Sequence, residues 1–149
     1  MSSKPASRKH PKTASPLFTA LAARQSESLS SSDATLLRCY IALDALRRGA
    51  GSTSVFSILA QHLILSINLC KQGYRVERFP DIRAAQQGLL RMRRQADEAN
   101  SWALDEDGYH ATCRALEVLK EQLSLASSAQ VDTARKALVN LLETARRAA

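Results

Sequence analysis

Few side chains of this 149-residue sequence have the types and spacing that chemistry requires. His110 and Cys113 are about one helical turn apart and follow the acidic run Asp105–Asp107, so their atoms could serve as zinc ligands. The spacing matches no zinc finger or ribbon, however, and the acidic run lacks the glycine and distal glutamate of a calcium loop. We therefore expect no metal site here, and we expect this region to form a helix cap.

The sequence contains no arrangement typical of a catalytic site. There is no glycine-rich phosphate loop, no GxSxG elbow and no HExxH motif. His62 falls within an apolar helical arc, where we expect a core histidine bonded to Ser66 or to a backbone carbonyl; a buried switch or ligand group is the alternative. Glu117 and Glu121 are one turn apart, on what we expect to be a solvated face. We therefore expect no enzyme and no cofactor.

Basic residues provide the best candidate binding site. The formal net charge is +7, and residues 1–31 hold five cations against one acid, whereas the remainder holds 16 against 13. Such an excess is compatible with binding to nucleic acid. The candidate phosphate contacts are Lys4, Arg8, Lys9 and Lys12 near the N-terminus, and Arg83, Arg91, Arg93 and Arg94 in one predicted helix. In the alternative interpretation, Arg93 pairs with Asp97 and Arg94 with Glu98, which stabilises a helix surface only weakly.

A largely apolar helix, predicted from Ser54 to Gln72, is the element around which the others are arranged. No charged residue occurs from Gly49 to Cys70. The predicted buried stripe is Phe56, Ala60, Leu63, Ile67 and Cys70. An apolar arc this wide indicates a helix that is contacted from several sides. The run is about long enough to span a bilayer, but hydrocarbon would leave its serine, histidine and amide side chains poorly satisfied. We expect a soluble core helix and no membrane partner.

Residues 1–32, rich in serine, proline and lysine, are predicted to form a disordered basic arm, and residues 33–149 a single domain. Further helices are expected over 33–48, 80–100, 108–126 and from about 129 onward. In the first, the residues predicted to face inward are Leu36, Cys39, Tyr40, Leu43 and Leu46. In the last, they are Val131, Ala134, Leu138, Leu141, Ala145 and Ala148. The shared period near 3.5 residues predicts an all-α helical bundle of about four to five helices.

Cys39, Cys70 and Cys113 are odd in number and contain no CxxC pair. Each lies on or beside a predicted apolar face, where a thiol behaves as a small hydrophobe. A disulfide framework is therefore not expected, which favours a reducing, cytoplasmic location.

Several segments carry a family resemblance. They are ALDALRRGAGS at 42–52, the helix at 56–73, PDIRAAQQGLLR at 80–91, the region 102–108 and QLSLASSAQV at 122–131. Over about residues 36–135 the chain resembles small helical proteins of bacterial genomic islands and prophages labelled Fis-like transcriptional regulators. The resemblance implies a DNA-associated regulator. True Fis proteins end in a helix-turn-helix, but here the connection at 125–131 has no turn glycine, so we expect mostly non-specific phosphate contacts.

Two functions follow as hypotheses. The first is a cytoplasmic, non-catalytic transcriptional regulator that associates with nucleic acid. The alternative is a protein–protein interaction module that docks a helical partner or self-associates.

Overall fold

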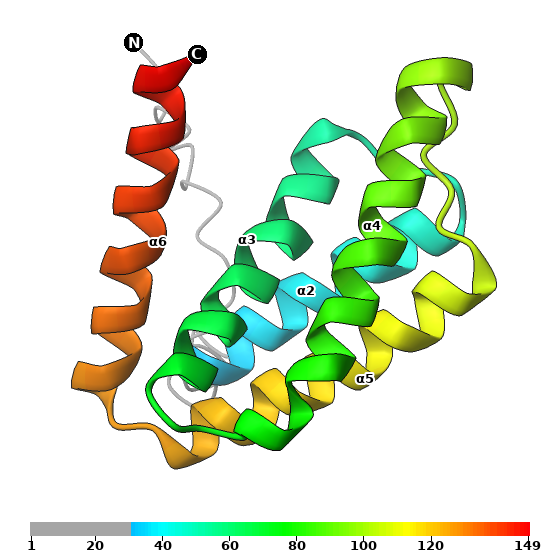
Figure 1. Ribbon diagram of the computed structural model, residues 1–149. Coiled ribbons are helices and arrows are strands. Elements are labelled where there is room, and N and C mark those ends of the chain that lie inside the picture. The colour runs from blue at the N-terminus through cyan, green and yellow to red at the C-terminus, as the bar shows by residue number, and fades with distance from the viewer. Residues whose placement is uncertain (1–30) are drawn as a thin grey trace, which may run out of the picture. The chain divides into compact units, whose positions relative to one another are not determined.

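The computed structural model describes residues 31–149, and helices make up nearly all of this part (Figure 1). The elements are α2 (Ser31–Arg47), α3 (Thr53–Lys71), the short 3-10 helix η1 (Val76–Arg78), α4 (Phe79–Ala99), α5 (Glu106–Leu125) and α6 (Ser128–Ala148). No strand occurs within residues 31–149, so the predicted all-α bundle is confirmed. The predicted arm and its cations Lys4, Arg8, Lys9 and Lys12 lie outside the described residues, apart from the last two positions of the arm, which begin α2.

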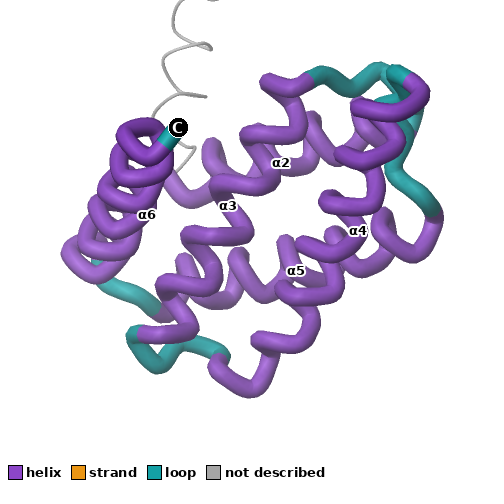
Figure 2. The backbone as a smooth tube through the Cα atoms, turned by 45° about the horizontal axis from the view of Figure 1, so that its top comes forward, coloured by secondary structure: helices purple, strands orange, loops and turns teal. Residues whose placement is uncertain are grey.

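Helices α2 to α5 form the body of the bundle, with α6 at one edge beside α3 (Figures 1 and 2). α4 runs antiparallel to both α3 and α5, and it packs most closely on α5 (Figure 1). The largest fully buried aliphatic side chains are Leu46, Leu59, Leu63, Leu65, Leu69, Ile82, Met92, Leu116, Val118 and Leu119. These come from α2, α3, α4 and α5, so the core lies between those four helices.

Side-chain caps set where three of the helices begin. Ser52 caps α3 by accepting a hydrogen bond from a backbone N–H, and Ser127 forms a reciprocal capping box with Gln130 at the start of α6. Asp105 caps α5 by accepting the Gly108 N–H at 2.6 Å. Because Asp105 is the cap, α5 begins at Glu106, two residues before the predicted start. The acidic run therefore does form the cap, as predicted.

The buried face of α3 differs from the predicted stripe. The fully covered positions are Leu59, Leu63, Leu65, Ser66, Leu69 and Cys70, whereas Phe56, Ala60 and Ile67 are only partly buried. The reason is that the polar side also packs against a helix: the Asn68 amide donates to the Ala134 carbonyl at 3.3 Å, and the Gln72 amide to the Gln130 carbonyl at 3.2 Å. Among the described helices, α3 alone is long and apolar enough to cross a membrane, but its buried leucines pack inside the bundle.

Two inward-facing predictions are wrong. Tyr40 on α2 is 41% exposed, because the buried side of that helix is centred on Cys39 and Leu46. On α6 only Ala134 is fully buried, and every residue from position 139 onward is exposed. The periodic apolar face of α6 is therefore covered along its N-terminal half only.

A buried amide joins α5 to the C-terminal end of α3. The Gln122 side chain is fully buried and its amide nitrogen donates to the carbonyls of Ser66 and Tyr74, both at 3.0 Å. Its amide oxygen accepts the Ser66 hydroxyl at 2.5 Å, and Cys70 Sγ lies 3.2 Å from the amide nitrogen. We refer to Gln122, Ser66, Cys70 and Tyr74 as the Gln122 cluster.

Two helices approach each other closely where Gly88 of α4 meets Gly108 of α5. A Cβ atom added at Gly88 would lie 2.7 Å from the Gly108 Cα atom, a distance that real structures essentially never show. The contacting atom belongs to the backbone, so no side-chain rotation could relieve the clash. Glycine at both positions is what allows α4 and α5 to pack this closely.

We expect Gly88→Ala to destabilise the fold by about 1–3 kcal/mol, because the two helices must separate to admit the methyl group. Gln87→Ala changes the neighbouring, exposed position and should alter the free energy of unfolding by less than about 0.5 kcal/mol. Chemical denaturation of both variants measures the difference. Equal stability of the two would show that the crossing tolerates a side chain.

Candidate functional site

The four arginines predicted as phosphate contacts on α4 do not converge. Arg91 and Arg93 flank the buried Met92 and point to opposite sides of the helix. Arg93 pairs with Asp97 at 3.3 Å, as the alternative interpretation predicted. Its guanidinium also lies 5.5 Å from the ring centroid of Trp102 and 5.7 Å from that of Phe56. The Arg93 side chain therefore already makes its contacts within the bundle.

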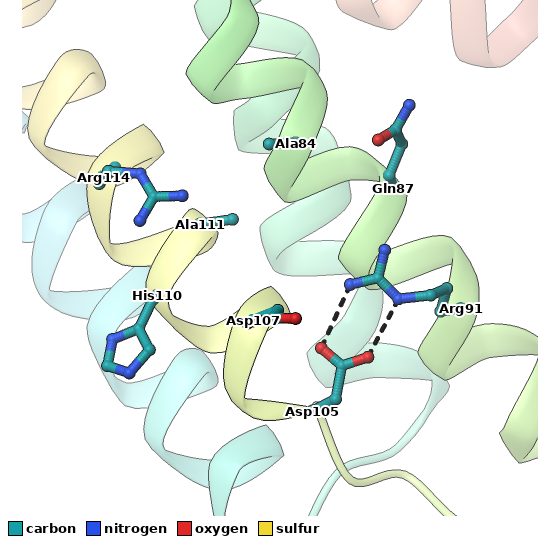
Figure 3. Close-up of a pocket in the computed structure, with 8 residues that line it drawn as sticks. All are labelled: Ala84, Gln87, Arg91, Asp105, Asp107, His110, Ala111 and Arg114. Atoms are coloured by element: carbon teal, nitrogen blue, oxygen red, sulfur yellow. Dashed lines mark hydrogen bonds and ion pairs between the residues drawn. The ribbon is translucent and has the colours of Figure 1, made fainter.

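Arg91 is held by the cap of α5 (Figure 3). Its Nε and Nη2 atoms donate to the two carboxylate oxygens of Asp105 at 3.0 and 3.2 Å. This two-point geometry is the strong form of an arginine–carboxylate pair. The hydrogen bonds from Arg91, and secondly the Gly108 N–H, hold the pKa of Asp105 below its ordinary value of 3.8, although partial burial opposes the shift.

Arg83 and Arg94 remain on the outer face of α4. Arg83 lies 5.9 Å from the Phe79 ring centroid, and within residues 31–149 neither arginine has a carboxylate partner, so the suggested Arg94–Glu98 pair is not formed. Eleven residues separate the two arginines, which is about 16 Å along a helix. They offer two separate cations where the sequence predicted one cluster.

An open depression of about 510 Å³ lies between α4 and α5 (Figure 3). The described residues around it are Ala84, Gln87, Arg91, Asp105, Asp107, His110, Ala111 and Arg114. Arg91 is neutralised by Asp105, and Arg114 lies 3.6 Å from Asp81. Neither a thiol nor a hydroxyl group is among these described lining residues. The geometry is that of paired charges holding two helices together.

The other candidate residues make structural contacts. His110 Nε2 lies 3.6 Å from Glu106 on the same helix, and no group of three or more potential ligands in residues 31–149 could hold a metal ion. His62 Nδ1 is 2.6 Å from the Ile58 carbonyl, so the predicted bond to a backbone carbonyl is confirmed, but the side chain is only partly buried and does not belong to the core. Burial lowers the pKa of His62, although the bond to Ile58 opposes this. Ser66 bonds Gln122 and not His62.

Glu117 is exposed, as expected, and the Glu121 side chain is 38% exposed but takes part in ion pairs that the sequence did not predict. The Glu121 carboxylate lies 2.8 Å from Arg75 Nε and 3.9 Å from Arg78, while Arg78 also pairs with Asp81 at 2.7 Å. These contacts join η1 and the start of α4 to α5. Several basic side chains therefore form ion pairs with other parts of the bundle.

Exposed apolar side chains on α2 and α6 are the feature that sequence reasoning missed. Leu37 and Ile41 on α2 are 50% and 62% exposed, and Val139, Leu141 and Leu142 on α6 are 50%, 52% and 41% exposed. Apolar periodicity predicted the helices, but it carries no signal that distinguishes a covered face from an uncovered one. They are among the exposed large apolar side chains of the described residues, and α6 carries three of them.

Comparison with family models, with curated proteins and with solved structures finds no match for this chain. The resemblance to Fis-like regulators therefore stays an expectation from the sequence.

The Arg91–Asp105 pair predicts a pH dependence. Because the folded-state pKa of Asp105 is lowered, its contribution to stability is present above the unfolded pKa and is lost as the pH falls through the folded value. Asp105→Asn keeps a capping side chain but loses the charge. We expect it to be less stable than the parent by about 0.5–1 kcal/mol at neutral pH.

We expect this difference to shrink as the pH is lowered from 5 to about 2, measured by urea denaturation at each pH. Glu98→Gln removes a charge that has no ion pair among the described residues, and it should show no comparable trend. A constant difference for Asp105→Asn would exclude a charge-dependent contribution.

Proposed function

We propose that this chain is a soluble, non-catalytic helical module that binds another protein through the exposed surface of α6. The observation that carries this proposal is the half-exposure of Val139, Leu141 and Leu142 on one helix. Apolar side chains gathered on the surface of a helix are typical of sites that dock a partner.

The attachment of α6 to the bundle supports the same proposal. Its contacts with the body come from its N-terminal half: Gln130 accepts the Tyr74 hydroxyl and the Gln72 amide, Ala134 accepts the Asn68 amide, and Arg135 donates to Thr35. Beyond Leu138 all side chains are exposed. The body thus holds one half of the helix and leaves the other half accessible, as Figures 1 and 2 show for its position at the edge of the bundle.

Cross-linking tests this proposal, because the described lysines are spread over three helices. Lys71 is at the end of α3, Lys120 is on α5 and Lys136 is on α6. When the protein is mixed with an extract of its native host and treated with an amine-reactive cross-linker, we expect Lys136 to be joined to another protein more often than Lys71 or Lys120.

Leu141→Ser combined with Leu142→Ser should reduce the cross-links from Lys136, because apolar burial stabilises docking by about 25 cal/mol per Å². Leu37→Ser on α2 serves as the control for a general loss of exposed apolar surface. Cross-links from Lys136 that persist unchanged in the double variant would argue against docking on α6.

A nucleic-acid-associated regulator is the second candidate. It is favoured by exposed cations that have no carboxylate partner within residues 31–149, among them Arg83, Arg94, Arg146 and Arg147. Such side chains are free to contact phosphates, which contribute affinity without sequence preference. This candidate also agrees with the regulator role that the family resemblance implies.

If duplex DNA is bound, each phosphate contact contributes about 0.9 to the slope of log affinity against log salt concentration. Arg83→Ala with Arg94→Ala should then lower that slope by about two, measured by fluorescence anisotropy. Arg48→Ala is the control, because Arg48 already pairs with Asp44 at 2.5 Å. No binding of the parent protein near about 50 mM salt, where electrostatic binding is strong, would reject the candidate.

A further inference from the structure

Four exposed residues of α6 form a stripe along its accessible side. Arg135, Val139, Leu142 and Arg146 are spaced four, three and four residues apart, which places them within an arc of about 60° on an α-helix. Val139 and Leu142, at the centre, are 50% and 41% exposed. An arginine stands at each end. We call these four residues the α6 stripe.

Neither arginine of the α6 stripe is neutralised by the body of the protein. Arg135 donates to the neutral hydroxyl of Thr35 at 3.3 Å, and Arg146 has no ion pair in the described part of the chain. The stripe therefore offers two apolar side chains between two cations whose charge is still available. The complementary surface has apolar residues at its centre and carboxylates at both ends.

We propose that the α6 stripe binds an acidic amphipathic helix of another protein. Its apolar side chains would cover Val139 and Leu142, while its carboxylates pair with Arg135 and Arg146. This inference rests on the proposed interaction function and specifies the chemistry of the partner. It requires no change in the fold, because all four side chains are already exposed.

A second copy of the chain does not satisfy the same surface. An antiparallel pairing that sets Val139 of one copy against Leu142 of the other also sets Arg135 against Arg146. A parallel pairing sets each arginine against itself. Like charges across an interface disfavour the complex, and the two half-exposed aliphatic side chains of the stripe provide only part of the roughly 800 Å² per partner that a typical stable interface buries.

The surface also fits a helix better than a membrane. The N-terminal half of α6 packs on α3 through the neighbouring face, with Ala134 fully buried at the contact. Helices that lie on membranes characteristically insert tryptophan, phenylalanine or leucine in a broad face, and α6 has no aromatic residue.

Two synthetic peptides test the inference, each about three heptads long with leucine at the a and d positions. One carries glutamate at the e and g positions and the other carries lysine. With the full-length protein at about 0.15 M salt, where screening acts beyond roughly 8 Å, anisotropy should show micromolar binding of the glutamate peptide. The lysine peptide should bind at least about tenfold more weakly, which is 1.4 kcal/mol.

Substitutions of three exposed residues distinguish binding at the α6 stripe from general charge attraction. Leu142→Gln should weaken the glutamate peptide about tenfold. Arg146→Glu should weaken it and strengthen the lysine peptide. Arg147→Glu makes the same change in net charge one position away, off the stripe, and should have a clearly smaller effect. Circular dichroism checks that each variant keeps the helical content of the parent.

Four outcomes would overturn the inference: failure of the glutamate peptide to bind, equal binding of both peptides, equal effects of Arg146→Glu and Arg147→Glu, or evidence that the stripe serves another occupant. That evidence would be a dimer in light scattering that Leu142→Gln dissociates, or binding to phosphatidylserine vesicles that Leu142→Gln abolishes. Equal binding of both peptides would leave docking on α6 intact and reject only the acidic partner. Unchanged Lys136 cross-links in the serine double variant would instead reject docking itself.

Discussion

The Gln122 cluster is the interaction on which the rest of the fold depends. One buried amide on α5 satisfies the backbone carbonyls of Ser66 and Tyr74 and the hydroxyl of Ser66. Tyr74 lies three residues after the end of α3, so the amide holds the turn in which the chain leaves α3 toward α4. A buried carbonyl without a partner costs about 1–3 kcal/mol, and a shorter or apolar side chain at position 122 would remove this bond from the Tyr74 carbonyl. The bond therefore ties the turn between α3 and α4 to α5.

Many charged side chains of this protein make contacts that hold its helices together. Arg75 and Arg78 hold Glu121 next to the same turn, Arg91 holds the cap of α5, and Arg93 lies over two aromatic rings. A net charge of +7 therefore overstates what is available for a partner. The cations without a carboxylate partner in residues 31–149 include those on the outer face of α4 and those on α6, and both proposed functions depend on these.

The helices of the bundle differ in how closely they pack on one another. α4 and α5 approach so closely at Gly88 and Gly108 that a single methyl group would not fit. α6, in contrast, is attached through a few hydrogen bonds and one fully buried alanine, Ala134. A rigid body that presents a partly free helix is well suited to binding, because the body fixes the position of the surface while the helix keeps its side chains accessible.

The sequence by itself determined the helices, because caps, glycines and apolar periodicity are local. The starts near Ser52 and Ser127 and the left-handed ends at Gly49 and Gly73 were all predictable, and Gly49 and Gly73 do have φ values of +72° and +100°. Tertiary structure decided what each face meets. Periodicity marks a face as apolar but does not say whether another helix covers it, so the exposure of α6 could not be predicted. The hydrogen-bond partners of Gln122 and Arg91 could not be predicted either, because they lie on other elements, and only the packed core establishes how these elements are oriented.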